Sequence, residues 1–185
     1  HAGKNDVSTW RKCVIKINSV CIYGVGGVGG YFGAKIANAI NLNNPTNREI
    51  YFIARGEHKE AIKHDGIKLI TTDETIVGIP TKVTSDINEI PAPDLFLLGV
   101  KSYDLDDVVK SIRSKINKNT VVIPLLNGAD IYDRIRANLN KGIVLPACVF
   151  VGTHIQKPGE ISQSGGDGKI LFGCDPKFPE FMADH

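Results

Sequence analysis

A doubly wound α/β fold with a mostly parallel sheet is the fold class that this sequence predicts. Short apolar runs with strand character alternate with segments in which apolar residues recur at helical spacing. Several of these runs are apolar almost throughout, which is typical of parallel strands that are covered on both faces. Near the C-terminus, a Pro-Gly turn between two strand-like segments adds a β-hairpin extension to this plan.

In the first half of the chain, strands and helices are expected to alternate from residue 18 onward. A buried strand over residues 18–23 leads into a helix over residues 28–42, because Val28, Phe32, Ile36 and Ala39 recur at spacings of three and four. The elements that follow are a strand over 49–54, a helix over 57–64 that stops at Gly66, and a hairpin formed by 67–71 and 75–79.

In the second half, strands and helices again alternate, and strand-like segments without helices follow. The apolar runs at 95–100, 120–126 and 142–151 each predict a strand. Two helices are expected between these strands, one marked by Leu105, Val108, Val109 and Ile112 and one by Ile131, Ile135 and Leu139. Residues 153–165 then predict a hairpin on the sheet margin, and residues 168–173 a last strand.

Composition excludes several classes of function. The chain has 185 residues, of which 42% are apolar and 23% charged, as in an ordinary globular protein with one full-sized domain. The net charge of +2 is too small to indicate nucleic acid or an anionic membrane as a partner. With no apolar run long enough to span a bilayer or serve as a signal peptide, a cytoplasmic protein is expected. The four cysteines lack zinc-site spacing, so no metal is predicted and reduced thiols are expected.

A glycine-rich turn between the first strand and the first helix is the strongest motif in the sequence. Gly24, Gly26 and Gly29 match GxGxxG in the strand-to-helix context of a Rossmann-type dinucleotide site. Gly24 would permit the tight turn, Gly26 would admit the pyrophosphate, and Gly29 would let the helix pack close to the strand. Gly27 and Val28 lie at the start of the helix, whose free N–H groups bind phosphate. A glycine turn without a ligand is the alternative.

The residue at the end of the second strand indicates which cofactor is bound. Folds that bind NAD carry an Asp or Glu about 20 residues past the glycines, where it accepts hydrogen bonds from the ribose 2′-OH. Here the strand ends in Arg55, 26 positions after Gly29 (55 − 29), and no carboxylate occupies the strand end. A guanidinium can bind a 2′-phosphate through two parallel hydrogen bonds, so NADP(H) is predicted. A solvated Arg55, or one that pairs with Glu57, is the alternative.

Five segments, taken together and in order, resemble the ketopantoate (2-dehydropantoate) reductase family. They are IYGVGGVGGYFGAKIA, IARGEHKEAIKHDGIKL, LLGVKSYDLDDVV, IPLLNGADIYDRI, and GTHIQKPGEISQSG with KILFG. The resemblance covers residues 17–173, and the VKS and LLNG motifs are its most specific parts. It implies an enzyme that transfers hydride from NADPH to the ketone of ketopantoate, giving pantoate on the route to pantothenate and coenzyme A.

The resemblance also assigns residues to the nicotinamide end of the site. Lys101 and Asn127 match family positions that contact the cofactor and the substrate, and Gly128 would let the backbone approach the nicotinamide. From the residues alone, Lys101 reads as a solvated lysine at a strand end. Asn127, from an Asn-Gly pair before a helix, is on the residues alone more often a turn or helix-cap residue.

The resemblance implies that the catalytic machinery is incomplete in these 185 residues. Family members carry their general-acid lysine and a substrate-binding glutamate in a C-terminal helical domain, and no position here matches that motif, so no catalytic residue is assigned. We expect a leader or tag remnant over 1–16, an NADP-binding domain over 17–175, and over 176–185 a truncated connection to the helical domain. The alternatives are a related hydroxy-acid or glycerol-3-phosphate-type dehydrogenase, or a non-catalytic NADPH-binding module. A homo-oligomer is compatible with the sequence.

Overall fold

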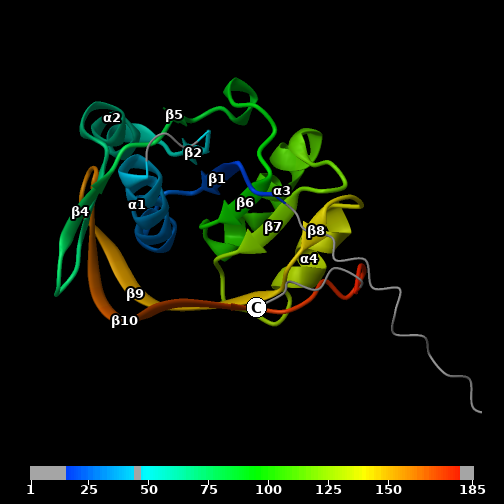
Figure 1. Cartoon of the computed structure of the whole chain (residues 1–185). Coiled ribbons are helices and arrows are strands. Elements are labelled where there is room, and N and C mark those ends of the chain that lie inside the picture. The colour runs from blue at the N-terminus through cyan, green and yellow to red at the C-terminus, as the bar shows by residue number, and fades with distance from the viewer. Residues whose placement is uncertain (1–15, 44–46, 180–185) are drawn as a thin grey trace, which may run out of the picture.

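The computed structural model describes residues 16–43 and 47–179, and its main element is a six-stranded parallel sheet with the order β5-β2-β1-β6-β7-β8 (Figure 1). Its strands are β1 (Ser19–Tyr23), β2 (Glu49–Ile53), β5 (Lys82–Thr84), β6 (Leu95–Leu98), β7 (Val121–Pro124) and β8 (Ile143–Val144). The chain first builds the sheet outward from β1 through β2 to β5, then returns to β6 on the other side of β1. The point where the strand order reverses therefore lies between β1 and β6, which is where doubly wound sheets bind ligands.

The central strands are apolar on both faces, as the sequence predicts for parallel strands. Cys21 in β1 pairs with Tyr51 on one side and with Phe96 on the other. All three residues are buried, and burial raises the pKa of the Cys21 thiol, which stays protonated at neutral pH. Cys148, by contrast, is exposed although it lies in an apolar run of the sequence.

Helices cover both faces of this sheet. The helices α3 (Leu105–Ile112) and α4 (Ile131–Asn138) pack on one face, and the apolar residues that predicted them are buried there. The helix α1 (Gly27–Leu42) covers the other face, where a side chain on Gly33 would come within 3.1 Å of Phe52 in β2. Ala39, predicted to face the core, is exposed. The short helix α2 (Gly56–Asp65) ends at Gly66, whose φ of +79° is a left-handed conformation that favours glycine.

A second, mixed sheet packs against α1 on the side away from the main sheet (Figure 1). It has the order β4-β3-β10-β9 and consists of β3 (Ile67–Ile70), β4 (Thr75–Gly78), β9 (Ala147–Lys157) and β10 (Glu160–Phe172). Both predicted hairpins are confirmed, but they join each other through a parallel pairing of β3 with β10. The C-terminal hairpin thus belongs to this second sheet and does not extend the margin of the first.

The stretch 142–151, predicted as one strand, divides at Pro146 into β8 and β9. Leu145 still donates its N–H to the Val122 carbonyl in the main sheet, at 3.0 Å. Pro146 has no N–H to continue that ladder, so the chain leaves the first sheet and enters the second. The strand β5 was not predicted, because its three residues, of which only Thr84 is buried, form no apolar run.

The segment after β10 is fixed to α4 by a buried carboxylate. Asp175 accepts hydrogen bonds from the Tyr132 hydroxyl at 2.7 Å and the Val144 N–H at 2.8 Å, and it forms an ion pair with Arg136. Burial alone would raise the pKa of Asp175, but these partners together hold it below its ordinary value. The expected domain end at residue 175 is therefore an ordered, buried position.

The remaining predictions on the chain ends fall largely outside the described residues. These are the leader, of which only Lys16 is described, the thiol of Cys13, and residues 180–185 of the expected connection. Among the helices within 16–43 and 47–179, none is both long and apolar enough to cross a membrane. Within the same ranges no group of His, Cys, Asp or Glu side chains is arranged to hold a metal ion.

Candidate functional site

The turn between β1 and α1 has the close packing that the glycine motif predicts. Gly24 has a φ of +89°, and a side chain on it would come within 2.7 Å of Val100. A side chain on Gly29 would overlap the Gly24 carbonyl oxygen, so the helix can start this close to the strand only with glycine there. The strand β6 also approaches, because the Gly99 N–H donates to the Tyr23 carbonyl at 2.8 Å. These glycines shape the turn, as predicted.

Gly26, by contrast, faces open space, since a Cβ placed on it would have no atom within 4 Å. The helix α1 begins at Gly27 with no side-chain cap and no acidic residue in its first turn. The N–H groups of Gly27, Val28 and Gly29 precede the first hydrogen bond back along the helix, from the Gly30 N–H to the Gly26 carbonyl at 2.7 Å. Uncapped donors, the positive end of the helix dipole and free space fit a pyrophosphate.

Val28 and Gly27 can serve such a ligand only through their backbones. The Val28 side chain packs against the core cluster that includes α1 and β1. A side chain on Gly27 would come within 2.7 Å of the Thr153 carbonyl oxygen in β9. The second sheet therefore lies directly against the start of α1, a contact that the sequence did not indicate. The Thr153 hydroxyl is buried there without a hydrogen-bond partner in the described part of the chain.

Arg55 lies just beyond the carboxyl end of β2, beside the glycine turn. It is exposed, and its backbone caps α2 in an extended conformation. The Arg55 guanidinium has no hydrogen-bond or ion-pair partner among the described residues, so the pairing with Glu57 that we considered does not form. With no carboxylate at this strand end, the charge of Arg55 is available to an anion.

His58, three residues after Arg55, joins α2 to the hairpin of the second sheet. Its Nδ1 accepts a hydrogen bond from the Gly159 N–H at 3.0 Å, which requires that nitrogen to be unprotonated. Burial lowers the pKa of His58, although the nearby Val25 backbone acts in the opposite direction. The neutral imidazole thus ties the hairpin turn to the helix that follows Arg55. Sequence reasoning missed this contact because it joins residues 101 positions apart.

Lys101 follows β6 by three positions and is exposed at the same edge of the sheet. Its backbone precedes a single 3-10 turn, η3 (Ser102–Asp104), and accepts a hydrogen bond from the Asp104 N–H at 3.0 Å. No side chain in the described part of the structure pairs with the Lys101 ammonium. An unpaired cation is left facing solvent at the end of a central strand.

Asn127 follows β7 and has a structural contact that the sequence did not predict. Its carboxamide donates to the Val149 carbonyl at 3.0 Å and accepts from the Val149 N–H at 2.8 Å, which fastens β9 to the end of β7. It does not cap α4, whose N-cap residue is Asp130. A carboxamide has two N–H donors and two lone pairs, so one of each remains for a ligand. Gly128 lies beside it in an exposed turn.

The carboxyl ends of four adjacent parallel strands bring these residues into one row. In the order β2, β1, β6, β7 they are Arg55, the glycine turn, Lys101 and Asn127. Three strand spacings separate the two ends of the row, about 14 Å at 4.8 Å each. An exposed arginine, an uncapped helix start and an exposed lysine in this order would suit the negative charges of an extended dinucleotide.

Comparison with known proteins identifies the family of this chain. Residues 20–177 match the family model described as ketopantoate reductase PanE/ApbA. A 2-dehydropantoate 2-reductase of Pyrococcus abyssi is 30% identical over 169 residues, which cover 89% of this chain and 52% of that protein. The crystal structure of 2-dehydropantoate 2-reductase from Porphyromonas gingivalis W83 superposes with a TM-score of 0.76 at 36% identity, covering 85% of this chain and 54% of that one.

A structure of D-mandelate dehydrogenase with NADH and anilino(oxo)acetate shares the fold, with a TM-score of 0.71 over 88% of this chain and 50% of that one, at 22% identity. The chain spans about half the length of the curated relatives it matches. The family model nevertheless covers both the glycine turn and the ends of β6 and β7. On its sequence and its fold, this chain belongs to the ketopantoate reductase PanE/ApbA family.

Proposed function

We propose that this chain is the nucleotide-binding half of an NADPH-dependent reductase that converts 2-dehydropantoate to pantoate, on the route to pantothenate and coenzyme A. The observation that carries the proposal is the row of Arg55, the open glycine turn and Lys101 along one sheet edge. The names of the Pyrococcus abyssi and Porphyromonas gingivalis relatives supply the substrate.

In this proposal each part of the row has one task. Arg55 binds the 2′-phosphate, and the uncapped start of α1 beside Gly26 binds the pyrophosphate. Bound NADPH supplies the hydride. Lys101 adds positive charge where the substrate carboxylate and the developing alkoxide lie, which stabilises both. Asn127 offers its second N–H donor from a carboxamide that is already held in place by Val149.

The proton that the alkoxide needs comes, in this proposal, from a group outside the described residues. A positioned general acid contributes roughly 10²- to 10⁴-fold to such a reaction. Lys101 and Asn127 are the only members of the row beside the nicotinamide end, and we give neither the role of proton donor. We therefore expect the 185-residue chain to bind NADPH and to reduce ketopantoate far more slowly than a full-length family member.

The fold shared with D-mandelate dehydrogenase favours, as a second candidate, a related NAD(P)-dependent reductase with another 2-oxo acid as substrate. Both candidates need the same nucleotide site and differ only in the substrate pocket. Turnover of ketopantoate compared with phenyl-substituted 2-oxo acids, measured on a protein that includes the remaining half, separates the two. A non-catalytic module would bind NADPH and turn over none of them.

Titration of the chain with NADPH and NADH tests the nucleotide assignment. We expect tighter binding of NADPH, and in Arg55→Ala a loss of about 1.5–3 kcal/mol for NADPH, roughly 10- to 150-fold, with little change for NADH. Arg48→Ala is the matched control, because Arg48 is an exposed arginine just before the other end of the same strand, β2. Equal affinities for the two cofactors in the unmodified chain would overturn the NADPH assignment.

A further inference from the structure

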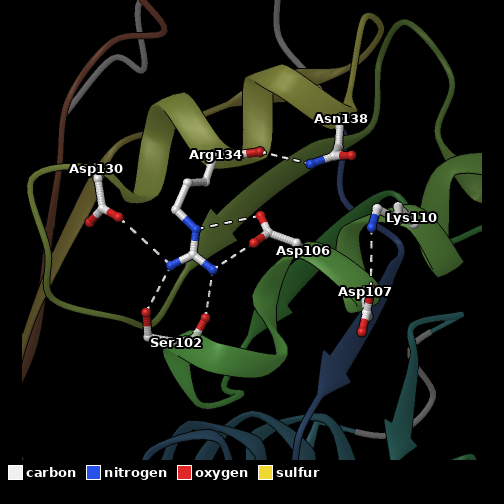
Figure 2. Close-up of polar contacts among 7 residues, drawn as sticks. All are labelled: Ser102, Asp106, Asp107, Lys110, Asp130, Arg134 and Asn138. Carbon is white, nitrogen blue, oxygen red and sulfur yellow. Dashed lines mark hydrogen bonds and ion pairs between the residues drawn. The ribbon is translucent and has the colours of Figure 1, made fainter.

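One arginine side chain joins the turn that carries Lys101 to the helix that follows Asn127 (Figure 2). Arg134 lies in the second turn of α4 and reaches across to η3. Its Nη1 donates to the Ser102 hydroxyl at 2.8 Å, and its Nη2 donates to the Ser102 carbonyl at 2.7 Å. Ser102 is the residue directly after Lys101, so the guanidinium holds the neighbouring residue by both its side chain and its backbone.

The rest of the guanidinium is bound just as firmly. Nη2 and Nε donate to the two oxygens of Asp106 at 2.9 and 3.4 Å, and Asp130 lies 3.7 Å from Nη1 (Figure 2). The hydrogen bond from Arg134 holds the pKa of Asp106 below its ordinary value, so this carboxylate stays ionised at neutral pH. Only a planar fork with five donors can make these contacts at once, and the single ammonium of a lysine cannot.

The contacts of Arg134 with Ser102 matter for Lys101 because the Lys101 side chain has no partner of its own among the described residues. The direction in which it leaves the backbone is set by the conformation of the turn, and the turn is fixed at Ser102 by Arg134. We propose that Arg134 is a positioning residue that fixes Lys101 against the β7–α4 turn, so that the lysine points at the nicotinamide end of the bound cofactor. This inference rests on the role of Lys101 in the proposed function.

A second arginine provides a matched control. Arg113, in the 3-10 turn after α3, donates through Nε to the Asn138 carbonyl at the far end of α4, at 3.0 Å. It therefore links the α3 region to α4 as Arg134 does, but away from Lys101. If Arg134 only stabilises the packing of these helices, the two arginines should behave alike in every assay.

The test compares two ligands that share one half. NADPH reaches the nicotinamide end, whereas adenosine 2′,5′-bisphosphate fills only the adenosine end beside Arg55. We expect Arg134→Lys to weaken NADPH binding about fivefold or more, as for residues coupled through a shared backbone segment, here Ser102, and to leave the binding of adenosine 2′,5′-bisphosphate unchanged. Lys101→Ala should show the same selectivity, and the double variant should bind NADPH no more weakly than Lys101→Ala alone. Arg113→Lys should change neither ligand.

Thermal melting verifies that each variant is folded, and Ser102→Ala, which removes only the hydroxyl acceptor, gives a milder form of the same perturbation. Three results would overturn the role of Arg134 without affecting that of Lys101. They are an equal loss of affinity for NADPH and adenosine 2′,5′-bisphosphate in Arg134→Lys, the same loss of NADPH affinity from Arg134→Lys with and without Lys101→Ala, or the same loss of NADPH affinity in Arg113→Lys as in Arg134→Lys. If Lys101→Ala itself leaves NADPH affinity unchanged, the assignment of Lys101 in the proposed function fails and this inference fails with it.

Discussion

Replacing Gly26 by valine separates cofactor binding from folding more cleanly than any other change at this site. A Cβ at Gly26 meets no atom within 4 Å, and the backbone there, with φ of −83° and ψ of −156°, is extended and open to any residue. Gly26→Val should therefore alter the free energy of unfolding by no more than about 1 kcal/mol. The added side chain occupies the space in front of the uncapped start of α1, where the pyrophosphate would bind.

The expected loss of affinity follows from the donors that the valine would cover. Three backbone N–H groups, those of Gly27, Val28 and Gly29, precede the first hydrogen bond of the helix. A hydrogen bond to a charged group contributes about 1.5–3 kcal/mol, so losing two of the three costs about 3–6 kcal/mol. That corresponds to roughly 10²- to 10⁴-fold weaker binding of NADPH.

Gly29→Ala provides the contrasting variant. Its Cβ would overlap the Gly24 carbonyl oxygen, so the turn must open, at a cost on the scale of core overpacking, about 1–3 kcal/mol or more. Calorimetric titration with NADPH and thermal melting without ligand should thus separate the two variants, because Gly26→Val should lose binding and keep its stability, whereas Gly29→Ala should lose stability. A Gly26→Val chain that binds NADPH as the unmodified chain does would refute the placement of the pyrophosphate at this turn.

Three further outcomes follow from contacts elsewhere in the domain. Asp175→Ala should lower the free energy of unfolding by about 3–5 kcal/mol, because it leaves the buried Arg136 unpaired. Since the pKa of Asp175 is lowered in the folded state, the stability that this carboxylate contributes should be present above about pH 4 and be lost below it in thermal melts at acid pH. His58, whose pKa is also lowered, should contribute stability above about pH 6.5 that is lost as the pH falls, and His58→Gln should flatten this part of the pH–stability profile. Asn127→Ala should reduce thermal stability through the lost Val149 contacts, whereas an Asn127 that acts only on ligands would leave the melting temperature unchanged.

Much of the main sheet could be predicted because its signals are local. Each apolar run or stripe lies within a dozen residues, and the structure confirms the elements that these signals predict. They are the strands β1, β6 and β7 and the helix marked by Leu105, Val108, Val109 and Ile112. The second sheet could not be predicted in the same way. Its defining pairing joins Lys68 to Glu160, 92 positions apart, and neither hairpin carries a signal that it will meet the other.

The candidate site shows the same division between local and distant causes. The glycine turn and Arg55 are readable because the strand-to-helix context lies in adjacent residues, and the structure brings both to one edge of the sheet. The partners of Asn127 and Arg134 depend on which strands and helices become neighbours, so no short motif reveals them. For Asn127 in particular the sequence suggests a helix cap or a ligand contact, and the structure shows a further contact, a hydrogen bond to Val149 in β9.

The second sheet is best understood as a support for the proposed nucleotide site. Three contacts connect it to the carboxyl edge of the main sheet: Thr153 lies against Gly27, Gly159 donates to His58, and Val149 pairs with Asn127. They reach the start of α1, the helix after Arg55 and the end of β7, so the hairpin of β9 and β10 contacts three of the four sections of the row. Because a parallel sheet fixes only its strands, the loops at their ends need such outside contacts to hold one geometry. The hairpin therefore supplies the rigidity that a site assembled from four separate loops requires.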